Sequence, residues 1–139
     1  MKFSLVLGVA LISAFLIGCN KDSLKGCEEH SKSLCNEDIN KTNIRIINNS
    51  KYDFCNVVLN PTGGNVNYGI IEKGTSTCYK VYDKAFNYAY TSLQIGDETF
   101  TFQPIDYVGE PELGTGKFSY SIDVLSYGDR TLTITANKD

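Results

Sequence analysis

The sequence has no tryptophan and a single histidine among its 139 residues. The histidine, His30, lies in a polar segment near the N-terminus, so the rest of the chain has no imidazole for a Ser-His-Asp or Cys-His catalytic arrangement. A site for a transition metal usually needs more than one such side chain, and the lack of tryptophan weakens the case for a platform that stacks sugar rings. These absences predict a protein that is not an enzyme and uses no cofactor.

The chain also lacks an excess of basic residues, since 13 Lys and Arg side chains stand against 16 Asp and Glu side chains. The net charge of -3 argues against nucleic acid as a partner, because a nucleic-acid interface needs a basic face. It also argues against electrostatic binding to anionic lipid. Attachment to a membrane must therefore depend on a feature of the sequence other than its charge.

That feature is an apolar run at residues 3–17, preceded by Lys2 and followed by a glycine and Cys19. The run is shorter than the roughly 20 apolar residues of a membrane span. A positive charge, an apolar run and a small residue follow one another here, which is the order of an export signal. Residues 16–19 (Leu-Ile-Gly-Cys) resemble a bacterial lipobox, in which a diacylglycerol is attached to the cysteine and the preceding bond is cleaved. We expect residues 1–18 to be removed and Cys19 to carry a lipid that holds the chain to a membrane.

Residues 19–41 are mostly polar, offer almost nothing to bury, and predict a tether between the membrane and a folded domain. Asn20, directly after the cysteine, resembles lipoproteins that are sent to the outer membrane. The pair Lys21 and Asp22 partly matches the charged export signal of surface-displayed lipoproteins. We therefore expect a protein anchored by lipid to the cell outer membrane, facing either the periplasm or the cell surface.

Four cysteines remain after Cys19, and an even number in an exported chain favours disulfides. Three pairings are possible. We favour Cys27 with Cys35, as a staple within the tether, and Cys55 with Cys78, between two neighbouring strands. The spacings do not fit a zinc site, which uses closely spaced ligands.

From residue 42 onward the pattern is that of short β-strands separated by turns. The clearest alternation of apolar and polar residues is at 118–124. Regularly spaced short strands indicate an antiparallel sandwich or barrel, and the polar outward faces favour a β-sandwich, Ig-like or transthyretin-like, over residues 42–139. The sequence predicts seven or eight strands, and the candidate segments are 43–48, 54–59, 69–71, 76–82, 89–95, 99–103, 118–124 and 131–135.

Three segments resemble a group of small lipoproteins of Bacteroidota-type bacteria: 68–71 (YGII), 79–90 (YKVYDKAFNYAY) and 103–110 (QPIDYVGE). The resemblance covers most of residues 43–124. It implies an exported, single-domain β protein, in agreement with the pattern of strands, and it implies no particular activity.

Asp106, Glu110 and Glu112 lie together in a glycine-containing loop at 104–116. Hard cations prefer several oxygen ligands, so such a loop could hold Ca²⁺ or recognise a partner through its charge. The spacing does not match an EF-hand. We favour the alternative, a solvated loop, and expect no metal site.

The nine tyrosines are the other candidates, because tyrosine is amphipathic and enriched in binding surfaces. Side chains such as Tyr88 and Tyr90 could line a contact patch, or could simply pack on one face of their strands. Loops on a rigid scaffold commonly carry function. The best candidates for partner binding are Tyr68, Asp106, Tyr107 and Glu110.

Two functions remain open. The first is a non-enzymatic interaction module that contacts an envelope, surface or host protein, or a glycan. The alternative is a periplasmic inhibitor or immunity-type protein that blocks an envelope enzyme. Because the tether is expected to enter the first strand near Thr42, we expect the binding loops to lie a strand's length away from the lipid.

Overall fold

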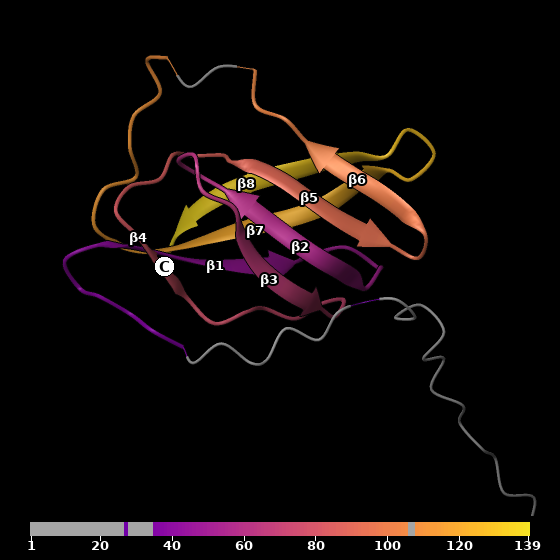
Figure 1. The fold of residues 1–139 in the computed structure, drawn as a ribbon, viewed down its shortest axis with the longest axis horizontal. Helices are drawn as coiled ribbons and strands as arrows, with labels where there is room; N and C mark the ends of the chain where they lie inside the picture. The colour runs from indigo at the N-terminus through magenta and orange to yellow at the C-terminus, as the bar shows by residue number, and fades with distance from the viewer. Residues whose placement is uncertain (1–26, 28–34, 106–107) are drawn as a thin grey trace, which may run out of the picture.

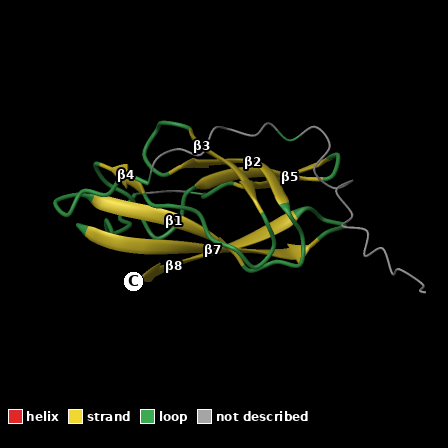
Figure 2. Ribbon diagram, turned by 90° about the horizontal axis from the view of Figure 1, so that it is seen from below, coloured by secondary structure: helices red, strands yellow, loops and turns green. Residues whose placement is uncertain are grey.

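Eight strands form two facing sheets in the computed structural model, which describes residues 27, 35–105 and 108–139 (Figure 1). The all-β sandwich predicted from the sequence is confirmed, and Figure 2 shows the two layers edge-on. Within the described residues no helix is long and apolar enough to cross a membrane. The strands are β1 (Thr42–Asn48), β2 (Phe54–Asn60), β3 (Val66–Ile71), β4 (Lys80–Tyr82), β5 (Tyr90–Ile95), β6 (Glu98–Phe102), β7 (Gly116–Ser126) and β8 (Thr131–Lys138).

The strand order is β4-β1-β7-β8 in the first sheet and β3-β2-β5-β6 in the second. Neighbouring strands run antiparallel except β1 and β7, which are parallel with Ile44 opposite Phe118. The sequence predicted an antiparallel sandwich, and this parallel pair is the exception to it. Parallel neighbours need a long connection, and residues 49–115, which include the whole of the second sheet, provide one.

The core lies between the two sheets and is filled by alternating side chains from both. Phe118, Tyr120 and Ile122 of β7 are buried, as the alternation in this strand predicted. Full burial of a large apolar side chain is worth roughly 1.5–3 kcal/mol, so this core gives the loops a rigid frame. The largest fully buried side chains of the second sheet are Phe54, Phe100, Leu59, Ile71 and Leu93.

The connections between strands gather at the two ends of the sandwich. We call one end the loop end, because it carries the three connections at 61–65, 83–89 and 103–115. The opposite end, the turn end, carries the short connections 49–53, 96–97 and 127–130. In Figure 1 the loop end lies to the left and the turn end to the right.

The start of β1 lies at the loop end, which corrects the expectation that the entry of the chain is far from the binding loops. The Thr42 hydroxyl donates a hydrogen bond to the Gly114 carbonyl oxygen at 2.7 Å. The Gly116 amide donates to the Lys41 carbonyl oxygen at 3.0 Å. Thr42 is therefore directly beside the connection 103–115.

Two disulfides fasten the N-terminal segment to the sandwich, and their pairing differs from the one expected. Cys27 is bonded to Cys55 and Cys35 to Cys78, with Cα–Cα distances of 5.3 and 5.1 Å. The predicted pairs, Cys27 with Cys35 and Cys55 with Cys78, are wrong. All four cysteines do form disulfides, as predicted, and the two bonds attach this segment to both sheets, because Cys55 is in β2 and Cys78 lies just before β4.

Residues 35–41 also lie on the domain, although they were expected to form part of a free tether. The Asp38 amide donates to Asn43 Oδ1 at 2.8 Å, and Asn43 Nδ2 donates back to the Asp38 carbonyl oxygen at 2.8 Å. The Glu37 carboxylate is 2.6 Å from Lys117 Nζ. These contacts are polar, so the lack of apolar residues in this segment gave no sign of them.

Candidate functional site

The loop end holds an open groove with a volume of about 640 Å³, whose walls come from all three connections or the strand ends beside them. Small-molecule sites commonly measure about 300–1,000 Å³. Asn60 at the end of β2 and Tyr90 at the start of β5 face each other across the two strands. The lining mixes side-chain amides with aromatic rings, and we call this hollow the amide groove. It is lined by Asn60, Pro61, Thr62, Gly63, Asn65, Lys84, Phe86, Tyr90 and Gln103.

One wall of the amide groove, the connection 61–65, is held in shape by Asn60. Its Oδ1 accepts a hydrogen bond from the Gly63 amide at 2.6 Å, and its Nδ2 donates to Asn65 Oδ1 at 3.0 Å. Asparagine commonly folds a turn onto itself in this way. Gly63 has a φ of 91°, which a side chain would strain. The sequence Asn-Pro-Thr-Gly-Gly-Asn thus encodes a preformed wall.

The connection 83–89 contributes Phe86 to the lining, and the backbone of Phe86 is fixed from two directions. The buried Tyr120 donates its hydroxyl hydrogen to the Phe86 carbonyl oxygen. Phe86 also forms a β-bridge with Glu112, and the neighbouring Leu113 amide donates to the Ala85 carbonyl oxygen at 2.8 Å. The half-buried ring of Phe86 therefore sits on a backbone that both the core and the connection 103–115 hold in place.

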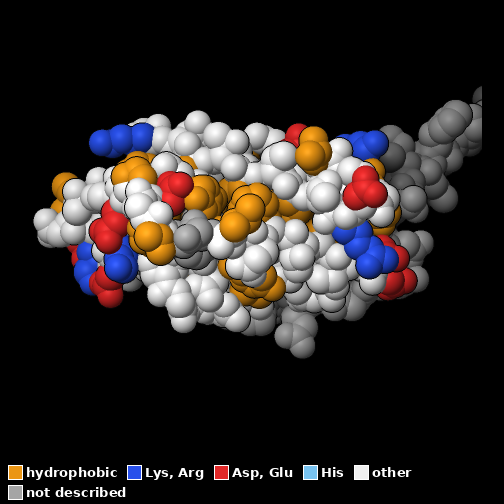
Figure 3. All heavy atoms as spheres, turned by 90° about the horizontal axis from the view of Figure 1, so that it is seen from above, with side chains coloured by type: hydrophobic (Ala, Val, Ile, Leu, Met, Phe, Trp, Pro, Cys, Tyr) orange, Lys and Arg blue, Asp and Glu red, His pale blue; other side chains and the backbone are white. Residues whose placement is uncertain are grey.

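A second hollow of about 480 Å³ adjoins the amide groove and shares Gln103 with it. Ile105 and Val108 are almost fully exposed, with exposed fractions of 102% and 88%. Figure 3, which views the molecule from the side of β6 and β8, shows hydrophobic side chains gathered on this face. The second hollow is lined by Tyr88, Phe102, Gln103, Pro104, Ile105, Val108 and Glu110.

The residues that the sequence predicted for binding or lipidation differ in where they lie: at the loop end, outside the described residues, or in the core. Glu110 lines the second hollow, at the loop end. Asp106, Tyr107 and the lipidation candidate Cys19 lie outside the described residues. Tyr68 is in the core, where it packs among buried residues, and its assignment to a binding surface is wrong.

Tyr68 is buried because its hydroxyl finds partners inside the sandwich. It is 2.8 Å from the Tyr82 hydroxyl and donates to the Ile44 carbonyl oxygen at 3.2 Å. Burial raises the pKa of Tyr68 well above its usual value, and the neighbouring Tyr82 raises it further. Burial also raises the pKa of Tyr82, to about 12. Both phenols stay neutral and act as hydrogen-bonding core residues that join β3 of one sheet to β4 of the other.

We expect Tyr68→Phe to lower the free energy of unfolding by about 1–2 kcal/mol, because the Tyr82 hydroxyl and the Ile44 carbonyl oxygen each lose a buried partner. Urea unfolding followed by circular dichroism measures the loss. The matched control is Tyr127→Phe, at an exposed tyrosine of the turn end, and its effect should be close to zero. Equal effects of the two substitutions would contradict the structural role of Tyr68.

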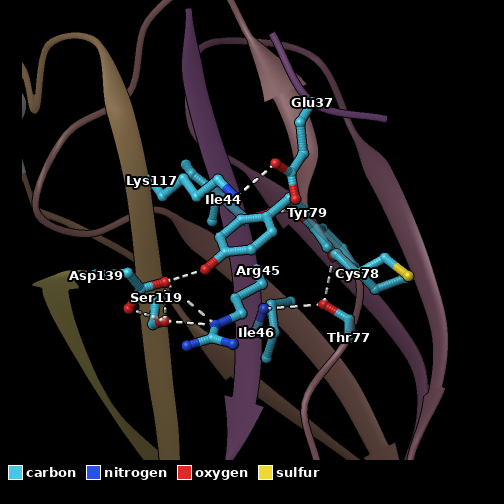
Figure 4. Close-up of polar contacts among 11 residues, drawn as sticks. Glu37, Ile44, Arg45, Ile46, Thr77, Cys78, Tyr79, Lys117, Ser119 and Asp139 are labelled. Carbon is cyan, nitrogen blue, oxygen red and sulfur yellow. Dashed lines mark hydrogen bonds and ion pairs between the residues drawn. The ribbon is translucent and has the colours of Figure 1, made fainter. Parts of the chain in front are cut away.

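A polar cluster that sequence reasoning missed covers the outer face of the first sheet (Figure 4). Ser119 Oγ donates to the Asp139 carboxylate at 2.6–2.8 Å, and Arg45 Nε donates to Ser119 Oγ at 2.8 Å. The Tyr79 hydroxyl also bonds to Asp139. The Tyr79 ring lies 5.2 Å from the Arg45 guanidinium and 5.0 Å from the ammonium of Lys117. This cluster joins strands that are far apart in sequence, and only the fold could reveal it.

The charge state of Asp139 gives the cluster a pH dependence. Although burial raises the pKa of Asp139, the hydrogen bonds from Ser119 and Tyr79 and the charge of Arg45 outweigh it, and the pKa stays below 3.8. A lowered carboxyl pKa stabilises the fold above the unfolded pKa, and this stability is lost as the pH falls through the folded pKa.

We therefore expect Asp139→Asn to lower stability at pH 7 by no more than about 1 kcal/mol, since exposed ion pairs are screened by solvent. The difference from the parent protein should vanish as the pH falls below 3.8. Thermal unfolding at a series of pH values measures it, and a difference that grows toward acid pH would contradict the assignment.

The chemistry of the loop end suits binding. Among the described residues no carboxylate lines the amide groove, and the charge of Lys84 is met by Glu112 at 3.6 Å. Among the described residues no group of three or more His, Cys, Asp or Glu side chains is placed to hold a metal ion. The amide groove therefore offers hydrogen bonds and aromatic contact to a ligand.

Comparison with known proteins supports the fold. No protein-family model matches the sequence, and no curated protein sequence matches it. The fold is similar to that of a solved structure described as an NMR structure of a protein from Eubacterium rectale, with a TM-score of 0.52 and 15% identity. The match covers 68% of this chain and 88% of the other. At this identity the likeness shows a shared β fold.

Proposed function

We propose that this chain is a lipid-anchored, non-enzymatic binding module of the bacterial cell envelope, held at the outer membrane through Cys19. Its partner is an envelope, surface or host protein, or a glycan, and it binds at the loop end. The lipobox at residues 16–19 supports the anchor. The two disulfides support an oxidising compartment outside the cytoplasm.

The observation that carries the proposal is that the N-terminal attachment and the grooves lie at opposite ends of the sandwich. Cys55 is the second residue of β2 and Asn60 is its last, so the bond to Cys27 is at the turn end while the amide groove is at the loop end. A strand rises about 3.3 Å per residue. An anchor that precedes Cys27 therefore leaves the loop end free to meet a partner.

The test is site-specific photo-crosslinking in living cells. A benzophenone amino acid placed at Thr62, on the rim of the amide groove, should give a discrete adduct of higher mass. The matched control places it at Thr133, which is also exposed but lies on β8, away from the grooves. Adducts at Thr133 equal to those at Thr62, or none at Thr62, would overturn the loop end as the binding surface.

A further inference from the structure

We infer that the amide groove binds a neutral saccharide. This inference names the ligand class for the binding role proposed above and rests on that role. Two aromatic side chains, Phe86 and Tyr90, and three amide side chains line one open groove. A sugar ring has an apolar C–H face and a rim of hydroxyl groups, so it can contact aromatic rings and amides at the same time.

The hydrogen-bonding groups of the groove match hydroxyls. Asn65 uses its Oδ1 to accept from Asn60, and its Nδ2 has no partner among residues 27, 35–105 and 108–139. Gln103 uses its Nε2 to donate to the Pro104 carbonyl oxygen at 3.2 Å, which leaves Oε1 as an acceptor. The groove thus offers a donor on one wall and an acceptor on another. A hydroxyl both donates and accepts, and can satisfy either.

The charges around the groove favour a neutral ligand. A cationic ligand would find no carboxylate among the lining residues that the structure describes. An anionic ligand would have to compete with Glu112 for Lys84, the one charged side chain in the described part of the lining. A polar ligand without charge meets neither difficulty.

The groove is also arranged before a ligand arrives. The hydrogen bonds of Asn60 fix the wall at 61–65, and the Tyr120 hydroxyl fixes the backbone that carries Phe86. Ordering loops on binding costs free energy, and a preformed site avoids much of that cost. Contacts to a sugar that are each weak can then together give a measurable affinity.

Saturation-transfer NMR on the full-length protein in a sugar-free detergent tests the inference. The probes are maltohexaose, cellohexaose and mannohexaose, with hexagalacturonate and an uncharged hexapeptide for comparison. We expect saturation transfer to at least one neutral hexasaccharide, and a weaker signal or none for the other two classes. Asn65→Asp, which keeps the acceptor for Asn60 and removes the donor, and Gln103→Ala should each weaken that binding about tenfold, since each removes a hydrogen bond to the ligand.

The matched control is Asn87→Ala, an exposed amide next to Phe86 that does not line the groove, and its affinity should equal that of the parent. Melting temperatures of all variants show that they fold. Binding of the hexapeptide or hexagalacturonate alone would overturn the inference, as would sugar binding that both groove substitutions leave unchanged. A lack of all sugar binding together with crosslinks at Thr62 would overturn the saccharide and leave the binding module standing. A lack of both would overturn both.

Discussion

Replacing Cys27 and Cys55 together by alanine is expected to lower the free energy of unfolding by about 3–4 kcal/mol, because a cross-link limits the freedom of the unfolded chain. The two residues are 28 positions apart in sequence. Replacing Cys35 and Cys78, which are 43 positions apart, should cost about 4 kcal/mol on the same argument. Urea unfolding under non-reducing conditions measures both losses.

The pairing itself is tested by a third double variant, Cys27→Ala with Cys35→Ala. In the pairing that the structure shows, this variant loses both disulfides and leaves Cys55 and Cys78 as free thiols. Each of the other two double variants should leave no free thiol among the four positions. Alkylation followed by mass spectrometry counts the thiols. A Cys27→Ala, Cys35→Ala protein without free thiols would restore the pairing expected from the sequence.

The pairing could not be derived from the sequence because it depends on where a polar segment lies. Residues 35–41 have little to bury, and a segment of that composition is usually a free linker. Here it is held by backbone and side-chain hydrogen bonds around Asp38 and Asn43 and by one covalent bond, from Cys35 to Cys78. Polar contacts of this kind follow no periodic pattern in the sequence, so the sequence could not predict them.

The sandwich itself was predictable, because strand alternation is a local property. In β7 the apolar residues Phe118, Tyr120 and Ile122 point inward, as their spacing of two requires. The parallel contact between β1 and β7 was not predictable. It joins Ile44 to Phe118 across more than half of the chain, and nothing local in either strand specifies its neighbour.

Tyrosine limits prediction of the site, because one residue type serves both core and surface. Tyr68 is buried because Tyr82 comes within 2.8 Å from the other sheet, which the sequence cannot show. The amide groove was missed because Asn60, Phe86 and Gln103 come from different parts of the chain. One feature of the sequence could have pointed to the groove: the turn residues at 60–65, which predict a loop of defined shape.

The attachment of Cys27 at the turn end also limits how far the domain can extend from the membrane. If the lipid is on Cys19, the first disulfide follows it after eight positions, at Cys27. An extended chain spans at most about 3.3–3.6 Å per residue, so the turn end stays within about 28 Å of the lipid. With the lipid on Cys19, the disulfide would thus shorten the tether and leave the loop end on the side of the sandwich farther from the lipid.

Cys19→Ala is expected to abolish incorporation of labelled palmitate, to leave an uncleaved precursor, and to release the protein from the outer-membrane fraction. Cys19 is the only cysteine that follows the lipobox pattern, and the other four are taken up in disulfides. Metabolic labelling and membrane fractionation measure the effect, and Ser23→Ala, which leaves the lipobox intact, is the matched control. Continued labelling of the Cys19→Ala protein would show that the anchor is elsewhere. Loss of labelling with retention in the outer-membrane fraction would show that lipid is not what holds the protein there, and the membrane-distal position of the amide groove would lose its basis.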